Sequence, residues 1–223
     1  MINYTSKEEI IDKIKGVIKS PFEEKGFHLK RKRFFERTDS CGNVQQYEID
    51  ISKRKGYFSL HLKLNLLNKC LMKKVNSVLE KAMRDERYPF PDNWDATFIK
   101  KNIKDRTSNS NVLGLTDWRE FKEEDETLED FNERFSIWIF NFDKIDEKEG
   151  WQKQLLMSVE FALKWFSKVE GDEWIINNTV YPSLYLLKER KNLNELQEEY
   201  AQILNLSRLR KEEVELFYYH LTK

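Results

Sequence analysis

Apolar residues recur at two different periods along the 223-residue chain, and this change of period predicts a mixed α+β fold. At the amino-terminal end, Ser6 and Glu9 have the spacing of a helix capping box. Apolar residues then follow at three- and four-residue steps: Ile10, Ile11, Ile14, Val17, Ile18 and Phe22. Because Gly26 suits the left-handed position that ends a helix, we expect a helix from Ser6 to Lys25 with one buried stripe.

After Phe27 the period changes to two, which is typical of strands with one buried face. We expect strands near 28–37, 44–53 and 57–66, joined by polar turns. Their apolar faces carry Leu29 in the first strand, Tyr47, Ile49 and Ile51 in the second, and Phe58, Leu60, Leu62 and Leu64 in the third. The pattern predicts a three-stranded antiparallel meander covered by the first helix, with one to three further strands elsewhere.

The rest of the chain reads mainly as helix. Helical patterns cover 67–87, a short stretch near 128–135, 151–169, 181–190, 194–204 and 209–221. Further strands are expected at 97–103 and, buried on both faces, at 136–142, while 117–126 fits either strand or loop. These elements predict an α+β domain over 1–171 and a helical carboxy-terminal extension over 172–223, packed together as one unit.

The composition favours a folded chain without export signals. Aromatic residues make up 13% and charged residues 35% of the sequence, which supplies both a core and a charged surface. The first residues alternate acids, bases and isoleucines, unlike a signal peptide, and no apolar run approaches the roughly 20 residues of a spanning helix. The two cysteines, Cys41 and Cys70, lie in unlike contexts and fit a reducing compartment, so the sequence predicts a cytoplasmic protein without a membrane partner.

The net charge of zero conceals a division along the chain. Residues 1–104 contain 23 Lys and Arg against 14 Asp and Glu, whereas 105–223 contain 16 against 25. The two charged parts could meet different partners, or they could pair with each other inside the molecule; the further alternative is that these are ordinary solvated faces.

The basic part suggests nucleic-acid binding as one hypothesis. Residues 28–37 combine five bases with two adjacent aromatic residues, a mixture suited to phosphate contact and base stacking, and a second basic run follows at 53–55. The candidate residues are Lys30, Arg31, Lys32, Arg33, Arg37, Lys53, Arg54 and Lys55. The alternative is an edge strand whose charges prevent sheet-to-sheet aggregation, because alternation would divide these bases between two faces.

The acidic part suggests protein binding. Between Asp117 and Glu149 there are 13 acids against five bases, and the candidate contact residues are Glu123, Glu124 and Asp125. Their spacing is not that of a metal-binding loop, so we expect no metal ion here, and a solvated face is again the alternative.

Catalytic signals are weak throughout. Glu48, Asp50 and Lys53 invite comparison with metal-dependent nucleases, but the Glu-x-Lys spacing is missing. Ser59 and His61 could form an acid–base pair, yet no nucleophile elbow surrounds them. No glycine-rich phosphate loop exists among the seven glycines, so we expect no cofactor. The sequence favours a non-enzymatic protein, and a metal-dependent nuclease-like enzyme is kept as a second alternative.

The stretch from Phe22 to Arg37, with "Gly-Phe-x-x-Lys" and a basic aromatic strand after a first helix, resembles the bacterial family known as domain of unknown function number 4304. The segments 47–52, 57–64, 160–166 and 181–187 fit the further strands and closing helices of that family. The family offers no catalytic residues to transfer. The resemblance implies a small cytoplasmic domain that binds another protein, in an immunity-like or defence-associated role, with a basic toxin domain as the expected partner.

Overall fold

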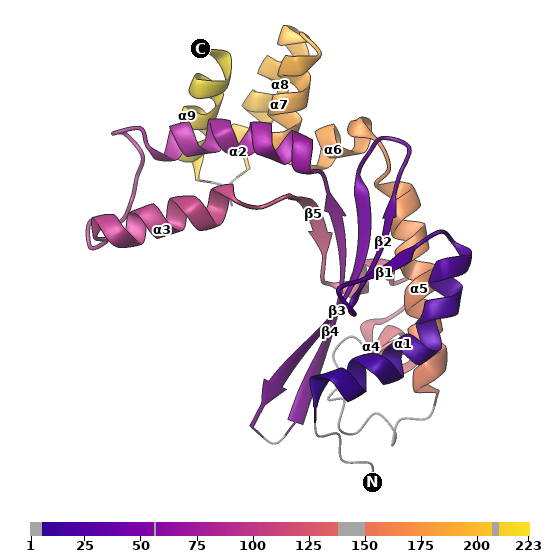
Figure 1. Cartoon of the computed structure of the whole chain (residues 1–223). Coiled ribbons are helices and arrows are strands. Elements are labelled where there is room, and N and C mark those ends of the chain that lie inside the picture. The colour runs from indigo at the N-terminus through magenta and orange to yellow at the C-terminus, as the bar shows by residue number, and fades with distance from the viewer. Residues whose placement is uncertain (1–5, 56, 138–149, 207–209) are drawn as a thin grey trace. The chain divides into compact units, whose positions relative to one another are not determined.

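The computed structural model describes residues 6–55, 57–137, 150–206 and 210–223 and confirms the α+β class (Figure 1). Its strands are β1 (His28–Lys30), β2 (Phe34–Thr38), β3 (Val44–Arg54), β4 (Tyr57–Leu67) and β5 (Asn111–Leu115). They form one five-stranded antiparallel sheet in the order β1-β2-β3-β4-β5, so every strand pairs with its neighbours in sequence. The expected antiparallel meander is therefore present, and the total of five strands in the described residues agrees with the expectation of three strands plus one to three more.

Most of the helices agree with the apolar stripes that predicted them, whereas α3 and η1 were not predicted as helix. They are α1 (Lys7–Glu24), α2 (Lys69–Met83), α3 (Ala96–Thr107), the 3-10 helix η1 (Trp118–Phe121), α4 (Leu128–Arg134), α5 (Trp151–Lys168), α6 (Asp172–Asn178), α7 (Tyr181–Glu189), α8 (Leu193–Leu204) and α9 (Lys211–Thr222). The Ser6 side chain accepts a hydrogen bond from the Glu9 amide at 3.3 Å and caps α1. The helical carboxy-terminal end is confirmed.

The expectation of one strand over 28–37 was wrong. A turn at Arg31–Arg33 divides it into β1 and β2, which pair with each other through the register Lys30↔Phe34. Arg31 (φ 46°) and Lys32 (φ 65°) have left-handed backbone, which costs a residue with a side chain about 1–2 kcal/mol. Neither residue is a turn former such as Gly or Asn, so the sequence pattern alone could not reveal this hairpin.

Two further expectations need correction. The strand expected at 97–103 is part of α3, because the Asp95 side chain accepts a hydrogen bond from the Phe98 amide at 2.8 Å and caps a helix there. Within 117–126, the strand-or-loop segment, the structure has η1. The buried strand expected at 136–142 falls mostly on residues outside the described ranges.

The chain packs as two compact units. Unit 1 consists of 1–66 and 113–170, and unit 2 of 67–112 and 171–223. Residues 67–112, which we expected within the first domain, therefore pack with the carboxy-terminal helices, since α2 contacts α7 and α9. The charge division along the sequence does not separate the units: unit 1 has 22 bases against 24 acids, and unit 2 has 17 against 15.

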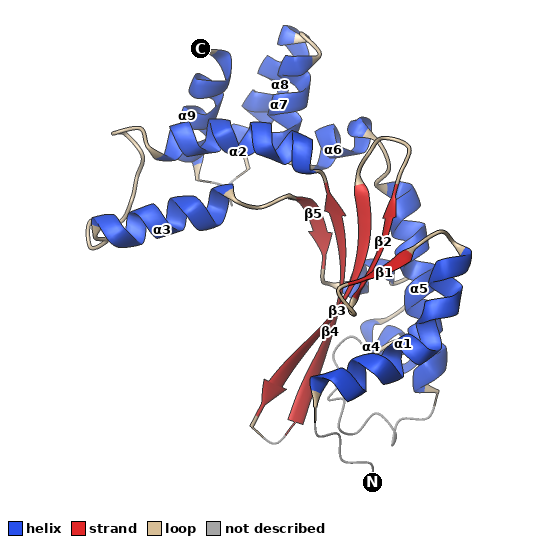
Figure 2. Ribbon diagram, viewed as in Figure 1, coloured by secondary structure: helices blue, strands red, loops and turns tan. Residues whose placement is uncertain are grey.

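In unit 1 the helices cover one face of the sheet (Figure 2). The buried stripe of α1 ends at Phe22, whose ring stacks on Phe35 of β2 with centroids 4.8 Å apart. On α5, the Ser158 hydroxyl lies 2.8 Å from the hydroxyl of Tyr47, and the Trp118 indole of η1 donates to the Leu62 carbonyl at 2.8 Å. The opposite face carries the polar residues of β2, β3 and β4.

Candidate functional sites

The polar face of the sheet in unit 1 is held by hydrogen bonds between strands. The Gln46 amide donates to Glu36 at 2.7 Å, and the Asn65 amide donates to Gln46 at 3.0 Å. The Lys63 ammonium reaches Asp50 at 2.7 Å. These bonds join β2, β3 and β4 side by side, so this face presents a preorganised polar surface rather than independent side chains.

Asp50 is the most strongly influenced carboxylate on this face. Partial burial by itself raises the pKa of Asp50, but the hydrogen bond and charge of Lys63 and the charge of Arg33 outweigh burial and hold the pKa below its ordinary value. The Arg33 guanidinium lies 3.8 Å from Asp50 and 3.6 Å from Glu48. Asp50 is therefore an ionised member of a charge network, not a poised general base.

The residues compared with a nuclease site, Glu48, Asp50 and Lys53, do not all come together in the structure. Glu48 and Asp50 project from the same face of β3, while the Lys53 ammonium lies 5.8 Å from the ring centre of Phe58, a residue of the buried face. Asp50 is paired instead with Lys63. Ser59 and His61 do meet, with 2.8 Å between the Ser59 hydroxyl and Nε2 of His61.

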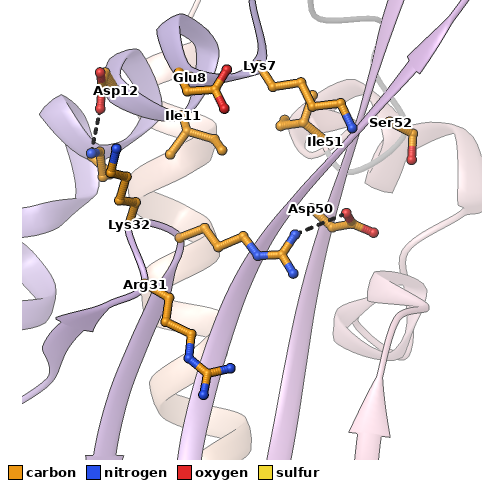
Figure 3. A pocket seen from close by; sticks show the side chains of 11 residues that line it. Lys7, Glu8, Ile11, Asp12, Arg31, Lys32, Asp50, Ile51 and Ser52 are labelled. Atoms are coloured by element: carbon orange, nitrogen blue, oxygen red, sulfur yellow. Dashed lines mark ion pairs between the residues drawn. The ribbon is translucent and has the colours of Figure 1, made fainter.

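A cavity of about 430 Å³ lies next to the turn Arg31–Arg33 in unit 1, which we call the basic turn (Figure 3). Its walls come from the first turns of α1, from the turn between β1 and β2, and from the middle of β3. The residues that line it are Lys7, Glu8, Ile11, Asp12, Lys15, Arg31, Lys32, Arg33, Asp50, Ile51 and Ser52. The register of β2 with β3 ends at Phe34↔Glu48, so the cavity lies where β3 continues past its neighbour.

The basic side chains of this cavity outnumber the acidic ones by five to three. Lys15 pairs with Asp12 at 2.5 Å, and Asp50 is already paired with Lys63 as well as with Arg33. Lys7, Arg31 and Lys32 form no ion pair with any described residue. Glu8 also lines the cavity without an ion pair to a described residue, so the lining keeps an excess of positive charge.

The remaining candidate bases have different surroundings. Arg37 donates two hydrogen bonds to Gln45 and one to the Lys25 carbonyl, and its guanidinium stacks over Phe27, so it connects β2 to the end of α1. Lys30, Arg54 and Lys55 are exposed at strand ends outside the cavity. The structure therefore brings Arg31, Lys32 and Arg33 together and does not bring all eight bases to one surface.

The acidic candidates lie on a loop between η1 and α4 that is fixed from both sides. The Glu126 carboxylate accepts two hydrogen bonds from the Arg134 guanidinium, one of which is 2.7 Å long. It also accepts a hydrogen bond of 3.1 Å from the Glu123 backbone amide. The Lys122 ammonium donates to the carbonyls of Glu123 and Glu126 at 2.9 and 2.5 Å. The hydrogen bond from Arg134 lowers the pKa of Glu126, which keeps this connection ionised.

Glu123, Glu124 and Asp125 occupy the outer side of this fixed loop. All three are exposed, and none forms an ion pair with a residue in the described ranges. We call this segment, Glu123–Asp125, the acidic loop. Glu123 and Glu124 also border a cavity of about 390 Å³ between the loop and α5. On its wall the rings of Phe121 and Phe161 stack with centroids 4.7 Å apart.

Several residues of these sites were not found from the sequence. Lys7 and Lys15 were not selected as candidates from the sequence, although their spacing of eight residues places both on one side of a helix. The contact between Phe121 and Phe161 joins segments forty residues apart, and no sequence pattern signals such a contact. The ion pair between Glu126 and Arg134 could have been found, because these opposite charges stand at the two ends of the short helix that Thr127 caps.

Comparisons with known proteins add no family: no family model matches the sequence, and no curated protein or solved structure matches it either. The resemblance carried by Phe22–Arg37 stays a prediction. In the part of the chain that the structure describes, no helix could cross a membrane, and no three His, Cys, Asp or Glu side chains gather as a metal site. Cys41 and Cys70 are both exposed free thiols.

Proposed function

We propose that this chain is a cytoplasmic, non-enzymatic protein-binding module that contacts a basic partner through the acidic loop. The observation that carries this proposal is the contrast within one loop. Its backbone is held by Lys122, Glu126 and Arg134, while the three consecutive carboxylates are exposed and form no ion pair with a described residue. A loop built in this way presents fixed negative charge at little entropic cost on binding.

The surroundings of the loop support a protein partner over a small cation. The adjacent cavity contains the rings of Phe121, Phe161 and Trp165, which suit an apolar anchor. The same cavity is also lined by charged residues, namely Glu120, Lys122, Glu123, Glu124, Lys164 and Lys168. The carboxylates would attract a basic surface over a longer range and thereby speed the encounter. A basic toxin domain has the required charge, in keeping with the immunity-like role that the resemblance implies.

The test is a comparison of two variants with equal charge change. Charge reversal of the acidic loop (E123K/E124K/D125K) should abolish capture of the partner from the cells that express the protein. The control reverses three exposed acids of α8 and α9 (E195K/E198K/E212K), a change that should leave capture intact. For the isolated partner, association at low salt should slow by about tenfold or more in the loop variant only. Equal effects of both variants on the association rate would refute the proposal.

Nucleic-acid binding remains the alternative hypothesis. It is favoured by Arg31–Arg33 and Lys53–Lys55, because the antiparallel register of β2 and β3 places both runs at the same end of the sheet. If it is right, a filter-binding series should show that affinity falls with salt, by about one unit of logarithmic slope per phosphate contact. Absence of binding to single-stranded and duplex probes at low salt would remove it.

A further inference from the structure

The cavity next to the basic turn has the features of a ligand site, and it is separate from the acidic loop proposed to bind a protein. Its volume of about 430 Å³ falls within the range of small-molecule sites, roughly 300–1,000 Å³. Lys7 lines it from α1, and Arg31 and Lys32 line it from the turn. Figure 3 shows the Lys7 ammonium near Ser52, the Lys32 side chain directed toward Asp12 and the Arg31 guanidinium turned away from both. Two isoleucines, Ile11 and Ile51, supply an apolar wall between them.

The backbone of the turn gives a second, independent reason. Arg31 and Lys32 both have positive φ, at positions where Gly or Asn would fit without strain. Strained backbone of this kind is concentrated at binding sites, where it fixes side chains in place. Here the strain places two adjacent bases at the mouth of a cavity that already contains Lys7.

From this arrangement we propose that the cavity binds a small phosphorylated molecule. On binding, the side chains of Lys7, Arg31 and Lys32, which lie apart in the free structure, turn inward to hold the phosphate, and Ile11 and Ile51 contact the apolar part. Phosphate matches the groups present: guanidinium donates paired hydrogen bonds to phosphate oxygens, and ammonium acts as a point charge. Arg33 is paired with Asp50 at 3.8 Å, so we assign it no contact with the phosphate. The enclosure by α1 suits a mononucleotide better than a duplex.

The decisive measurement is calorimetric titration of the full chain with pyrophosphate and with adenosine monophosphate at low salt. We expect saturable binding of one molecule per chain. The variant Arg31→Asn with Lys32→Asn should lose affinity by about tenfold or more, because it removes two charged contacts. The control Lys30→Gln with Lys55→Gln removes the same charge outside the cavity and should leave affinity within about twofold.

Two further readouts separate this proposal from its competitors. Asn tolerates left-handed backbone, so the Arg31→Asn/Lys32→Asn variant should melt at the same temperature as the native chain or higher, whereas loss of stability would indicate a structural role for these bases. The proposal is overturned if neither phosphate probe binds, or if both double variants weaken binding equally. Binding of a single-stranded oligonucleotide without binding of either small probe would also overturn it, in favour of a nucleic-acid surface.

Discussion

Glu213 is the residue of unit 2 with the most unusual surroundings. It lies on α9 with only 3% of its surface exposed, and its carboxylate accepts hydrogen bonds from Arg106 at 2.5 and 2.7 Å. The hydroxyls of Tyr88 and Tyr181 donate to the same carboxylate. Burial by itself raises the pKa of Glu213, but the hydrogen bonds from Arg106 and the two tyrosines outweigh it and lower the pKa. Four separate segments of unit 2 therefore meet at one ionised group.

Removing this charge should destabilise the fold. Glu213→Gln leaves the Arg106 guanidinium half-buried without its counter-ion, and we expect a loss of about 3 kcal/mol in the free energy of unfolding at pH 7. The neighbouring Glu212→Gln, on the exposed side of α9, should change stability by less than about 0.5 kcal/mol. Urea unfolding of the two variants makes the comparison, and equal effects would show that the cluster contributes nothing special.

The same cluster predicts a dependence on pH. Because the folded-state pKa of Glu213 lies below its ordinary value of 4.5, the folded protein takes up this proton less readily than the unfolded chain. The stabilisation should be complete above pH 4.5 and should decrease as the pH falls through the folded-state pKa. The difference in stability between the native chain and Glu213→Gln should therefore narrow in acid. A difference that stays constant from pH 7 to pH 3 would contradict the assignment.

Among the elements, β4 shows how one strand serves two purposes. Phe58, Leu60, Leu62, Leu64 and Leu66 are buried against the helices of unit 1. The alternate positions contribute His61, Lys63 and Asn65 to the polar face. Because of this period of two, a substitution on the buried side of the strand should affect stability more than a substitution on the polar side.

The strand register can be tested by two neighbouring substitutions. Leu62 is 2% exposed, so Leu62→Ala should lower stability by about 2–5 kcal/mol through lost burial and the cavity that remains. Lys63→Ala removes a partly exposed ion pair with Asp50 and should cost at most about 1 kcal/mol. Thermal unfolding of both variants distinguishes the positions. Equal shifts in melting temperature would mean that the strand or its register is wrong.

At the scale of the whole molecule, the chain makes two cores from four stretches of sequence. It leaves the sheet after β4, forms α2 and α3 within unit 2, and returns as β5 to complete the sheet. Each unit has its own buried residues: Phe22, Tyr47 and Trp118 in unit 1, and Ile103 and Phe217 in unit 2. Such units can open separately, because local unfolding follows the contacts within each core.

Hydrogen exchange should reveal this division. In the Leu62→Ala variant we expect faster exchange of buried amides in 6–55, 57–66, 113–137 and 150–170, with much smaller changes in 67–112 and 171–206. Glu213→Gln should give the opposite pattern. Uniform acceleration across both units in either variant would show that the chain unfolds as one cooperative body.

Local regularities in the sequence determined most of the secondary structure. The stripe of α1, the alternation in β3 and β4, and the carboxy-terminal helices depend on periods of 3.6 and 2 that repeat within a few residues. The residue types of the acidic loop and of the basic turn were also evident, and Glu123–Asp125 and Arg31–Arg33 are exposed or at a cavity as charged side chains should be.

Tertiary structure alone decided how those elements are used. The hairpin at Arg31–Arg33 has no turn residues, so only the pairing of β1 with β2 and of β2 with β3 shows it. The cavity joins Lys7 to Lys32, and the cluster around Glu213 joins Tyr88, Arg106 and Tyr181, across separations that no periodic pattern spans. Periodicity reports which face of an element is buried, whereas a site depends on which faces meet, and that is set by the packing of the whole chain.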